Sequence, residues 1–300
     1  MLTTKHLLFA VVVTFFWAIC FPLIELGHRA APPLKFAAIR SAIAGLSLVL
    51  PLIFLRRIRF WNSKVIIFSF FVSITHTVMG FGGMFLADGR IAPGLATVLA
   101  NTQPLIAAVL AYYFLKERLS LQNLLGLIIG FFGIVIIAFP KFLGDASSQG
   151  FLGIGYILVG ALGTGAGNVI MKKSTAECDL LQLTGYQLSI GGLVLFILSL
   201  FFEPQGQINW HSSFNWSLII LAIPGTSLTT VIWINLLKNV SLTKLNVFTL
   251  LTPAFGMAIG FLFFKERFSF IELLGIVFAL GGVYLATLEK KTILNNREAS

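Results

Sequence analysis

The chain has 300 residues, of which 57% are hydrophobic and 11% charged, and its mean hydropathy is +0.95. Average soluble domains are about 45–50% apolar and about 25% charged, so this composition excludes a soluble globular protein and favours an integral membrane protein. The formal net charge of +10 does not indicate a nucleic-acid partner, because the basic residues punctuate apolar runs instead of clustering on a water-facing surface.

Apolar runs bounded by charge, Pro and Gly predict an all-α integral membrane protein with ten transmembrane helices. In chain order the predicted spans are 7–27, 33–55, 65–87, 91–115, 121–140, 151–172, 180–202, 215–237, 244–264 and 270–288. At roughly 20 residues per span, the chain has no room for a separate soluble domain. The first run is long enough to cross a bilayer, so we expect a retained helix instead of a cleaved signal peptide.

The distribution of Lys and Arg predicts the orientation of these spans. Ten is an even number, so both termini are expected on one side of the membrane. With the N-terminus inside, fourteen of the 21 basic residues fall in cytoplasmic segments and Arg40 falls inside a span. The opposite side holds Arg29, Lys35, Arg90, Lys141, Lys265 and Arg267. The positive-inside rule therefore predicts a multi-pass protein of the cell (inner or plasma) membrane with both termini cytoplasmic.

The sequence resembles itself at a shift of 149 residues. Segment 115–126 (LKERLSLQNLLG) aligns with segment 264–275 (FKERFSFIELLG), and eight positions are identical between 115–136 and 264–285. Four of the eight are Lys, Glu, Arg and Ser, so apolar bias does not explain the match. We predict two repeats, 1–145 and 146–300, with five helices each. Because five is odd, the second repeat would be inverted relative to the first, which is typical of transporters.

Several short motifs resemble a known family. They are the segments 17–22 (WAICFP) and 31–34 (APPL), Arg40, the segment 92–96 (APGLA) and the two KERxxS blocks. Their order and spacing resemble the EamA branch of the drug/metabolite transporter superfamily, over essentially the whole chain. The resemblance implies ten helices as two inverted five-helix repeats and a central cavity lined mainly by helices 1, 3, 4, 6, 8 and 9. It also implies export of amino acids or other metabolites.

The fourth predicted span carries the strongest candidate for a binding site. Asn101, Thr102, Gln103 and Pro104 lie near its centre. A proline inside a helix removes one backbone hydrogen bond and loosens the helix there, and polar groups at mid-membrane depth usually face a cavity or a partner helix. The corresponding segment of the second repeat keeps the proline and offers Thr252. The alternative is that the two amides only bond to neighbouring helices.

Five further residues are candidate contacts for the transported molecule. His76 is the one titratable group at the predicted midplane, and it is either a neutral hydrogen-bonded imidazole or a group linked to protons or cargo. Trp17 and Trp233 offer aromatic faces, and Asn168 and Asn235 offer amides for a polar head group. For each tryptophan the alternative is packing within the bundle.

Other polar residues have structural explanations. We expect Glu25 and Arg40, in the outer thirds of the first two spans, to form a neutralising pair. The KER blocks are expected at the membrane interface, with Ser120 and the pair Ser269 and Glu272 capping the following helices. Glycine pairs predict close helix packing within the bundle or dimerisation: Gly126/Gly130, Gly163/Gly167 and Gly256/Gly260.

These features favour an exporter of amino acids or similar small neutral or zwitterionic metabolites that works by alternating access. All eleven acids lie outside the central slab, which disfavours cationic-drug/proton antiport. We expect a small-molecule cargo, membrane lipid as surroundings, no nucleic acid, and a monomer or weak dimer, with proton coupling through His76 left open. A multidrug or nucleotide-type transporter remains an alternative within the superfamily.

Two other classes are a channel and a membrane-embedded enzyme. The four histidines are scattered and no spacing suits a metal or a nucleophile, so we predict no catalytic residue, no metal and no cofactor. Cys20 is predicted inside a span and Cys178 in a loop, which makes a disulfide between them improbable.

Overall fold

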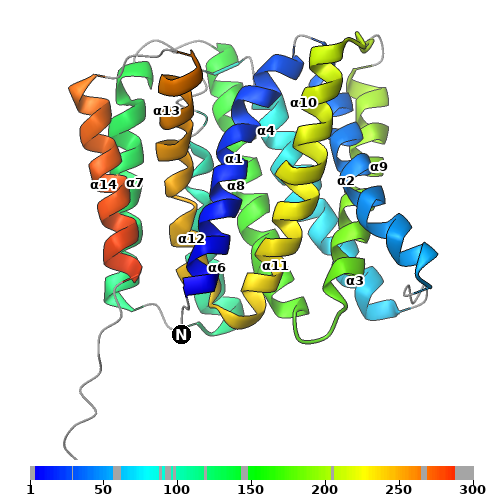
Figure 1. Cartoon of the computed structure of the whole chain (residues 1–300), viewed down its shortest axis with the longest axis horizontal. Coiled ribbons are helices and arrows are strands. Elements are labelled where there is room, and N and C mark those ends of the chain that lie inside the picture. The colour runs from blue at the N-terminus through cyan, green and yellow to red at the C-terminus, as the bar shows by residue number, and fades with distance from the viewer. Residues whose placement is uncertain are drawn as a thin grey trace, which may run out of the picture.

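The computed structural model describes residues 4–28, 30–56, 62–87, 90–91, 96, 99–117, 120–142, 148–203, 206–264 and 269–287. Every regular element in this part of the chain is a helix. The helices stand side by side as one bundle, and the start of the first helix and the end of the last lie at the same end of it (Figure 1).

The described residues form fifteen helical elements. Residues before 143 form α1 (Thr4–His28), α2 (Pro33–Phe54), α3 (Ser63–Val72), η1 (Ser73–Phe81), α4 (Gly82–Ala87), α6 (Gln103–Leu115) and α7 (Leu121–Phe142). The later residues form α8 (Ser148–Ser174), α9 (Leu180–Phe202), α10 (Ser212–Ala222), η2 (Ile223–Leu228), α11 (Thr229–Asn239), α12 (Leu242–Phe248), α13 (Leu251–Phe264) and α14 (Phe270–Thr287).

Seven stretches of the described chain are long and apolar enough to cross a membrane: Thr4–Ile24, Pro33–Phe54, Ser63–Ala87, Gly150–Ser174, Leu180–Phe202, Ser212–Asn239 and Leu242–Ile259. Three further apolar helices are shorter, namely Gln103–Leu115, Leu121–Ile136 and Phe270–Leu285. Each of the ten overlaps one predicted span. The structure therefore supports a multi-pass helical membrane protein, with seven spans identified by length and composition.

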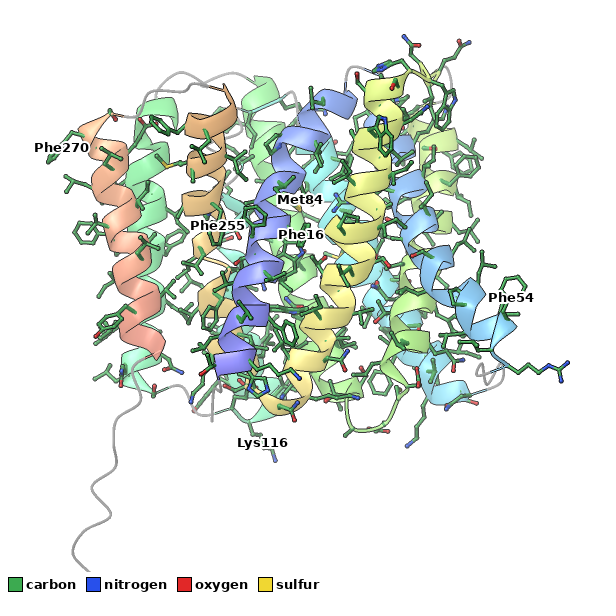
Figure 2. All side chains as sticks on the ribbon, in the orientation of Figure 1. Phe16, Phe54, Met84, Lys116, Phe255 and Phe270 are labelled. Atoms are coloured by element: carbon green, nitrogen blue, oxygen red, sulfur yellow. The ribbon has the colours of Figure 1, made fainter. Side chains whose placement is uncertain are left out.

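The outer surface of the bundle is covered with large apolar side chains (Figure 2). Phe54, Tyr113, Phe151, Phe201 and Phe270 are all at least 70% exposed. Water-soluble proteins rarely expose contiguous apolar surface on this scale. The hydrocarbon core of a bilayer contains no water, so apolar side chains can face it without cost. This surface fits contact with lipid.

Two of the seven membrane-long stretches, here called rods, each contain a π-helical segment. The two segments lie at corresponding positions of the two predicted repeats. The rod Ser63–Ala87 is interrupted by η1, and the rod Ser212–Asn239 is interrupted by η2. Shifting η1 by 149 residues places it over 222–230, which contains the whole of η2. Pro224 lies within η2 and cannot donate a backbone hydrogen bond there. π-helical segments within α-helices often lie at functional sites.

The chain also breaks near the two corresponding prolines. A turn at 101–102 precedes α6, and Pro104 lies in its first helical turn. A turn at 249–250 separates α12 from α13, which carries Pro253 in its first turn. Proline is favoured at the start of a helix, because the missing N–H has no partner there in any case. The turn at 101–102 lies inside the predicted span 91–115, beside Pro104, where the sequence predicts a loosened helix.

Glycines allow backbones to approach closely within the bundle. A Cβ on Gly133 would lie 2.5 Å from the backbone of Ala279, and one on Gly282 would lie 2.5 Å from that of Gly126. These contacts pack α7 and α14 against each other in antiparallel directions. Gly163 and Gly167 pack in the same way against η1. Close packing is confirmed for the predicted pairs Gly126/Gly130 and Gly163/Gly167. Gly256 faces open space, and the surroundings of Gly260 are not among the described features.

The first KER block has a structural role beyond the membrane interface. Lys116 ends α6 in a left-handed conformation with φ 54°. The carboxylate of Glu117 then accepts hydrogen bonds from the backbone N–H groups of Leu242 at 2.9 Å and Thr243 at 3.2 Å. Ser241, the N-cap residue of α12, provides no such side-chain bond, so Glu117 stabilises the start of α12 in its place. Glu117 thus caps a helix in addition to its predicted place at the membrane interface, and residues 265–268 of the second block lie outside the described part.

A second carboxylate caps a helix at the other end of the bundle. Glu203, after α9, accepts from the backbone N–H groups of Leu34 at 2.9 Å and Lys35 at 3.1 Å. Glu117 and Glu203 therefore each come from one predicted repeat and cap a helix of the other.

The predicted serine caps are also present. The hydroxyl of Ser120 accepts from the backbone N–H of Asn123 at 3.1 Å. The hydroxyl of Ser269 accepts from the N–H of Glu272 at 3.3 Å, and the Glu272 carboxylate accepts from the N–H of Ser269 at 2.8 Å. This is the reciprocal arrangement of a capping box.

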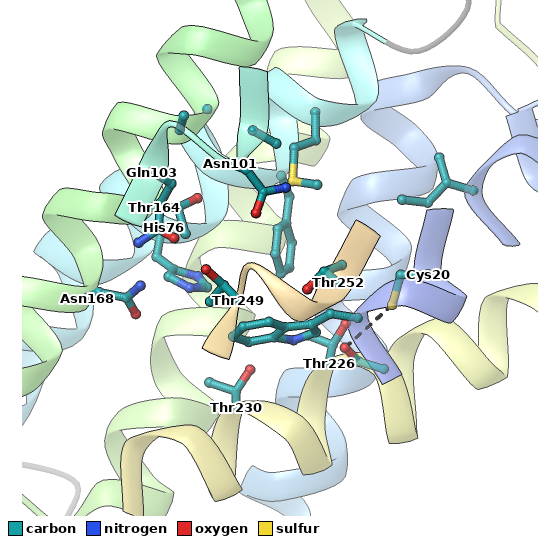
Figure 3. A pocket seen from close by; sticks show the side chains of 18 of the residues that line it. Cys20, His76, Asn101, Gln103, Thr164, Asn168, Thr226, Thr230, Thr249 and Thr252 are labelled. Atoms are coloured by element: carbon teal, nitrogen blue, oxygen red, sulfur yellow. Dashed lines mark hydrogen bonds between the residues drawn. The ribbon is translucent and has the colours of Figure 1, made fainter. Parts of the chain in front are cut away.

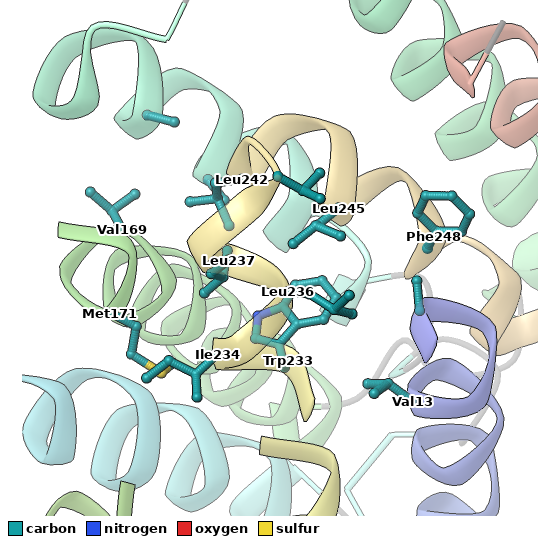
Figure 4. Packing of buried hydrophobic residues seen from close by; sticks show 14 of the residues in the cluster. Val13, Val169, Met171, Trp233, Ile234, Leu236, Leu237, Leu242, Leu245 and Phe248 are labelled. Atoms are coloured by element: carbon teal, nitrogen blue, oxygen red, sulfur yellow. The ribbon is translucent and has the colours of Figure 1, made fainter. Parts of the chain in front are cut away.

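Two apolar clusters occupy opposite ends of the bundle. The terminal-side cluster, at the end where α1 begins, includes Ala10, Val13, Val169, Met171, Trp233, Leu236, Leu237, Leu242 and Leu245 (Figure 4). The opposite cluster includes Ile24, Ala30, Leu34, Phe36, Phe85, Phe214 and Leu218. Along α1 the first cluster comes early and the second late, so the middle of that helix lies between them.

Candidate functional site

A cavity of about 140 Å³ lies between the two apolar clusters (Figure 3). It is lined by Trp17, Cys20, Ile24, Arg40, His76, Phe81, Met84, Ala100, Asn101, Gln103, Gly160, Ala161, Thr164, Asn168, Gly225, Thr226, Thr230, Thr249 and Thr252. An apolar cavity of about 150 Å³ in another protein accommodates a molecule the size of benzene. The cavity therefore suits a small molecule, and its hydroxyls and amides suit a polar one.

Six of the nine predicted contact residues line this cavity: Trp17, His76, Asn101, Gln103, Asn168 and Thr252. They come from α1, η1, the turn before α6, α6 itself, α8 and α13. The two interruptions described above expose some of these groups. His76 lies within η1, and Asn101 lies in the turn that precedes Pro104.

The other three predicted residues do not line the cavity. The hydroxyl of Thr102 donates to the backbone oxygen of Leu99 at 2.7 Å. Trp233 is 1% exposed and lies behind the wall, where its indole N–H donates to Asn168 Oδ1 at 3.0 Å. Asn235 is exposed, and its amide donates to the backbone oxygen of Val231 at 2.8 Å.

Helical geometry explains the place of Asn235. Successive residues of an α-helix are rotated by about 100°, so Asn235 points roughly opposite to Trp233, two residues earlier. Trp233 packs inward, with its ring centroid 5.1 Å from that of Trp17. Trp233 and Asn235 therefore lie on different faces of α11, and neither of these two predicted contacts lines the cavity.

Arg40 lines the cavity, although the sequence predicted a structural role for it. It lies on α2 and is 5% exposed. Its Nε donates to Thr226 Oγ1 at 2.8 Å, and its Nη2 lies 3.6 Å from Cys20 Sγ. The guanidinium carbon lies 4.7 Å from the ring centroid of Phe81. The expected neutralising pair is absent from the described contacts of Arg40, and the side chain of Glu25 lies outside the described residues.

Polar atoms without a protein partner surround the same space. His76 Nδ1 and Gln103 Nε2 have no hydrogen-bond partner among the described residues, although both side chains are more than 90% buried. An unsatisfied buried polar atom costs roughly 1–3 kcal/mol, which makes such atoms rare and informative. Their position beside the cavity is suited to a bound molecule or water.

Threonine hydroxyls are the second feature that the sequence did not reveal. Thr164, Thr226, Thr230 and Thr249 line the cavity together with the predicted Thr252. Threonines are common in membrane helices, where the hydroxyl bonds to the preceding turn, so their identity alone gives no signal. Arg40 did carry a signal, because a charge inside a span is costly and usually functional.

The cavity wall combines residues from helices 1, 3, 4, 6, 8 and 9 of the predicted order with Arg40 from helix 2. Among the described lining residues there is no carboxylate. No group of three or more His, Cys, Asp and Glu residues in the described chain is arranged to hold a metal. The wall can therefore hydrogen-bond a small molecule and attract negative charge.

Comparison with known proteins agrees with this geometry. The EamA-like transporter family matches the chain twice, over residues 4–139 and 151–288. The uncharacterized transporter YoaV of Bacillus subtilis (strain 168) is 25% identical over 284 residues, covering 94% of this chain and 97% of the relative. The uncharacterized transporter YvbV of the same organism is 27% identical over 290 residues, covering 96% and 93%.

Two further comparisons extend beyond that organism. The protein PecM of Dickeya dadantii (strain 3937) is 27% identical over 261 residues, covering 84% of this chain and 82% of the relative. A solved crystal structure superposes with a TM-score of 0.77 at 16% sequence identity, covering 95% of this chain and 97% of that chain, and shows a shared fold. The chain thus belongs to the EamA-like transporter family and is a multi-pass membrane transporter of the drug/metabolite transporter superfamily.

Proposed function

We propose that this transporter exports amino acids or similar small neutral or zwitterionic metabolites across the cell membrane by alternating access. The observation that carries the proposal is the composition of the cavity wall. It offers the amides of Asn101, Gln103 and Asn168 and several threonine hydroxyls, with no carboxylate among the described lining residues. A cationic drug exchanged for protons would require a carboxylate to bind each in turn, whereas an amino acid requires hydrogen bonds at both of its ends.

The proposed architecture is ten helices arranged as two inverted repeats, 1–145 and 146–300. Three observations support it. The family matches the chain twice. The helices α7 and α14 begin 149 residues apart, at Leu121 and Phe270, and pack in opposite directions. The rods that contain η1 and η2 also begin 149 residues apart, at Ser63 and Ser212. Inverted repeats give one chain two similar packings that open to opposite sides.

The two apolar clusters support alternating access. Along α11 the cavity residue Thr230 is followed by Trp233, Leu236 and Leu237 of the terminal-side cluster. Along α2 the opposite-cluster residue Leu34 precedes the cavity residue Arg40. Apolar packing thus lies on both sides of the polar cavity, as a carrier requires and an open pore does not. In the proposed orientation the terminal-side cluster faces the cytoplasm, with both termini there, and the protein works as a monomer or weak dimer.

Flux measurements in proteoliposomes test this function. We expect saturable uptake of at least one amino acid, stimulated when the same amino acid is trapped inside. Asn101→Ala and Gln103→Ala should each lower this flux at least about tenfold, the effect of one lost hydrogen bond of roughly 1.4 kcal/mol. Asn235→Ala is the matched control, because this amide is exposed and outside the cavity.

Three results would contradict the proposal. If no amino acid is transported, the cargo class is wrong. Full flux in both cavity variants would show that the cargo binds elsewhere. Linear flux without stimulation by trapped cargo would indicate a channel.

His76 is the residue through which protons would be coupled to this transport. Its side chain lines the cavity, and its Nδ1 has no partner among the described residues. The variant His76→Gln keeps hydrogen-bonding capacity and removes titration. We expect the flux of this variant to lose its dependence on an imposed pH gradient, and an unchanged dependence would remove His76 from the coupling mechanism.

A further inference from the structure

A buried guanidinium inside a membrane protein needs compensation. Arg40 lies on a membrane-spanning helix and is 5% exposed. A charge at such a place usually pairs with an opposite charge or borders a water-filled cavity. Among the described side chains, its contacts are the Thr226 hydroxyl, the Cys20 sulfur and the faces of Phe81 and Phe85, at 4.7 and 5.8 Å from the guanidinium carbon. None of these neutralises the charge.

The described residues also leave most of the hydrogen-bonding capacity of Arg40 unused. A guanidinium has five N–H donors, and Arg40 makes two described hydrogen bonds, one of them to the weak acceptor sulfur. The Thr226 hydroxyl fixes Nε, and the aromatic face of Phe81 supports the plane of the group. This arrangement holds the guanidinium still and leaves its other edge for a ligand. A planar fork of this kind matches the two oxygens of a carboxylate.

The corresponding contact in the other half shows that the charge is not needed to connect the helices. Thr77 precedes Thr226 by 149 residues and lies in η1, as Thr226 lies in η2. Its hydroxyl donates to Gln187 Oε1 of α9 at 2.7 Å. A neutral amide is therefore sufficient to join a π-helical threonine to a neighbouring helix. Gln187 is fully buried and does not line the cavity, whereas Arg40 does.

Other groups around the cavity favour the same sign of charge. The helices α6 and α13 both begin at the cavity wall, with Gln103 and Thr252 in their first turns. Helix N-termini carry partial positive charge, and transporters direct the N-termini of interrupted helices at anionic groups of their substrates. No carboxylate among the described lining residues opposes this field.

We propose that Arg40 is the anion subsite of the cavity and binds a carboxylate of the transported molecule. The cargo class is then amino acids and other small carboxylic acids, and amines or amides of the same shape are rejected. This inference rests on the proposed transport function and narrows its substrate class. Thr226 is a positioning residue that holds the guanidinium through Nε. Arg40 itself contacts both interrupted rods, through Thr226 of η2 and Phe81 of η1.

Binding to the purified full-length protein in a low-chloride detergent buffer tests the subsite. The probes are the twenty L-amino acids, the carboxamide of each, and the simple acids acetate, pyruvate and benzoate. A molecule that binds the folded state raises the melting temperature. We expect at least one amino acid to raise it and the matching carboxamide to leave it unchanged. Isothermal titration then gives Kd for that amino acid.

Variants at Arg40 separate a binding role from a structural one. Arg40→Gln introduces the amide that the other half uses, and it should fold with a similar melting temperature but bind the acid about 30-fold or more weakly. Thr226→Val should weaken binding about tenfold without abolishing it. Arg56→Gln, on the exposed end of the same stretch of chain, and Thr229→Val, whose hydroxyl bonds only to the backbone, are matched controls. Both should bind as the wild type does.

The outcomes distinguish the subsite from the function on which it rests. Equal binding of acid and carboxamide, or equal affinity in Arg40→Gln and the wild type, would overturn the anion subsite and leave an amino acid carrier intact. Binding of the simple acids through Arg40 without binding of any amino acid would support the subsite and overturn amino acids as cargo. If neither set of acids binds in an Arg40-dependent manner, the subsite is wrong. If Arg40→Gln does not fold, Thr226→Val against Thr229→Val decides.

Discussion

The two interrupted rods, Ser63–Ala87 and Ser212–Asn239, differ in what holds their π-helical segments. Against η1, the backbone of α8 lies so close that a Cβ on Gly167 would lie 2.6 Å from that of His76. Against η2, the nearest contact of a Cβ on Gly225 would be the sulfur of Cys20, at 2.8 Å. The first segment is fixed by backbone packing, while the second borders side chains of the cavity. The two rods are thus interrupted at corresponding sequence positions, but the residues that pack against η1 and η2 differ.

The largest expected effect breaks the packing of the first segment. Gly167→Val would force α8 away from η1, because a Cβ at this position already lies 3.1 Å from the His76 backbone. Overpacking of this kind costs about 1–3 kcal/mol and occasionally more. We expect a clear loss of melting temperature. Gly155→Val on the same helix is the control, since no atom lies within 4 Å of its Cβ, and an equal loss in both variants would contradict the close contact.

The next prediction compares the two equivalent threonines. Thr77→Val leaves Oε1 of the fully buried Gln187 without its hydrogen-bond donor, and Gln187 Nε2 already has no described partner. A buried unsatisfied group costs about 1–3 kcal/mol. Thr226→Val leaves Arg40 Nε beside a cavity that water can enter, so its cost should be smaller. Thermal unfolding should therefore rank Thr77→Val below Thr226→Val, and transport should show the opposite order.

A smaller effect tests the carboxylates that cap helices across the repeats. Glu117→Ala removes the acceptor for Leu242 and Thr243 at the start of α12. Loss of an N-terminal cap costs about 0.5–2 kcal/mol. Glu203→Ala should cost a similar amount through α2, and the two losses should add, because the sites lie at opposite ends of the bundle. Chemical denaturation measures both, and a negligible effect of Glu117→Ala would return it to a purely interfacial role.

The smallest effect concerns an exposed ion pair between α3 and the loop before α9. Lys64 Nζ lies 2.8 Å from Glu177 Oε2, and this hydrogen bond lowers the pKa of the Glu177 carboxyl. Stability from the pair is therefore present above the ordinary carboxyl pKa and is lost as the pH falls through the lowered one. Solvent screens the pair, so Glu177→Gln should change the melting temperature at neutral pH within measurement error. A large change would show that this contact helps to hold α3 against the loop before α9.

Part of the structure was predictable because lipid imposes simple rules. Hydropathy located the apolar helices, and the glycine pair Gly126/Gly130 predicted close packing, which the structure shows between α7 and α14. The prolines at 104 and 253 marked the interruptions that deliver Asn101 and Thr252 to the cavity. Such features are local, so the sequence alone expresses them.

The rest depended on distances between helices that no local pattern contains. The order of residues does not reveal whether Arg40 meets a carboxylate or a cavity, and the structure places it against Thr226, 186 residues away. Asn235 is two residues from Trp233, and only the rotation of α11 shows that it faces outward. The π-helical segments were not predicted either, because Ser73–Phe81 contains no proline or other local signal for them.

A structure of the full-length protein with the tightest-binding amino acid tests the central claim most directly. The account predicts the cargo in the cavity between the two apolar clusters, with a carboxylate oxygen about 2.8 Å from a terminal guanidinium nitrogen of Arg40. Cargo bound outside this cavity, or bound inside it with its carboxylate directed away from Arg40, would contradict the account.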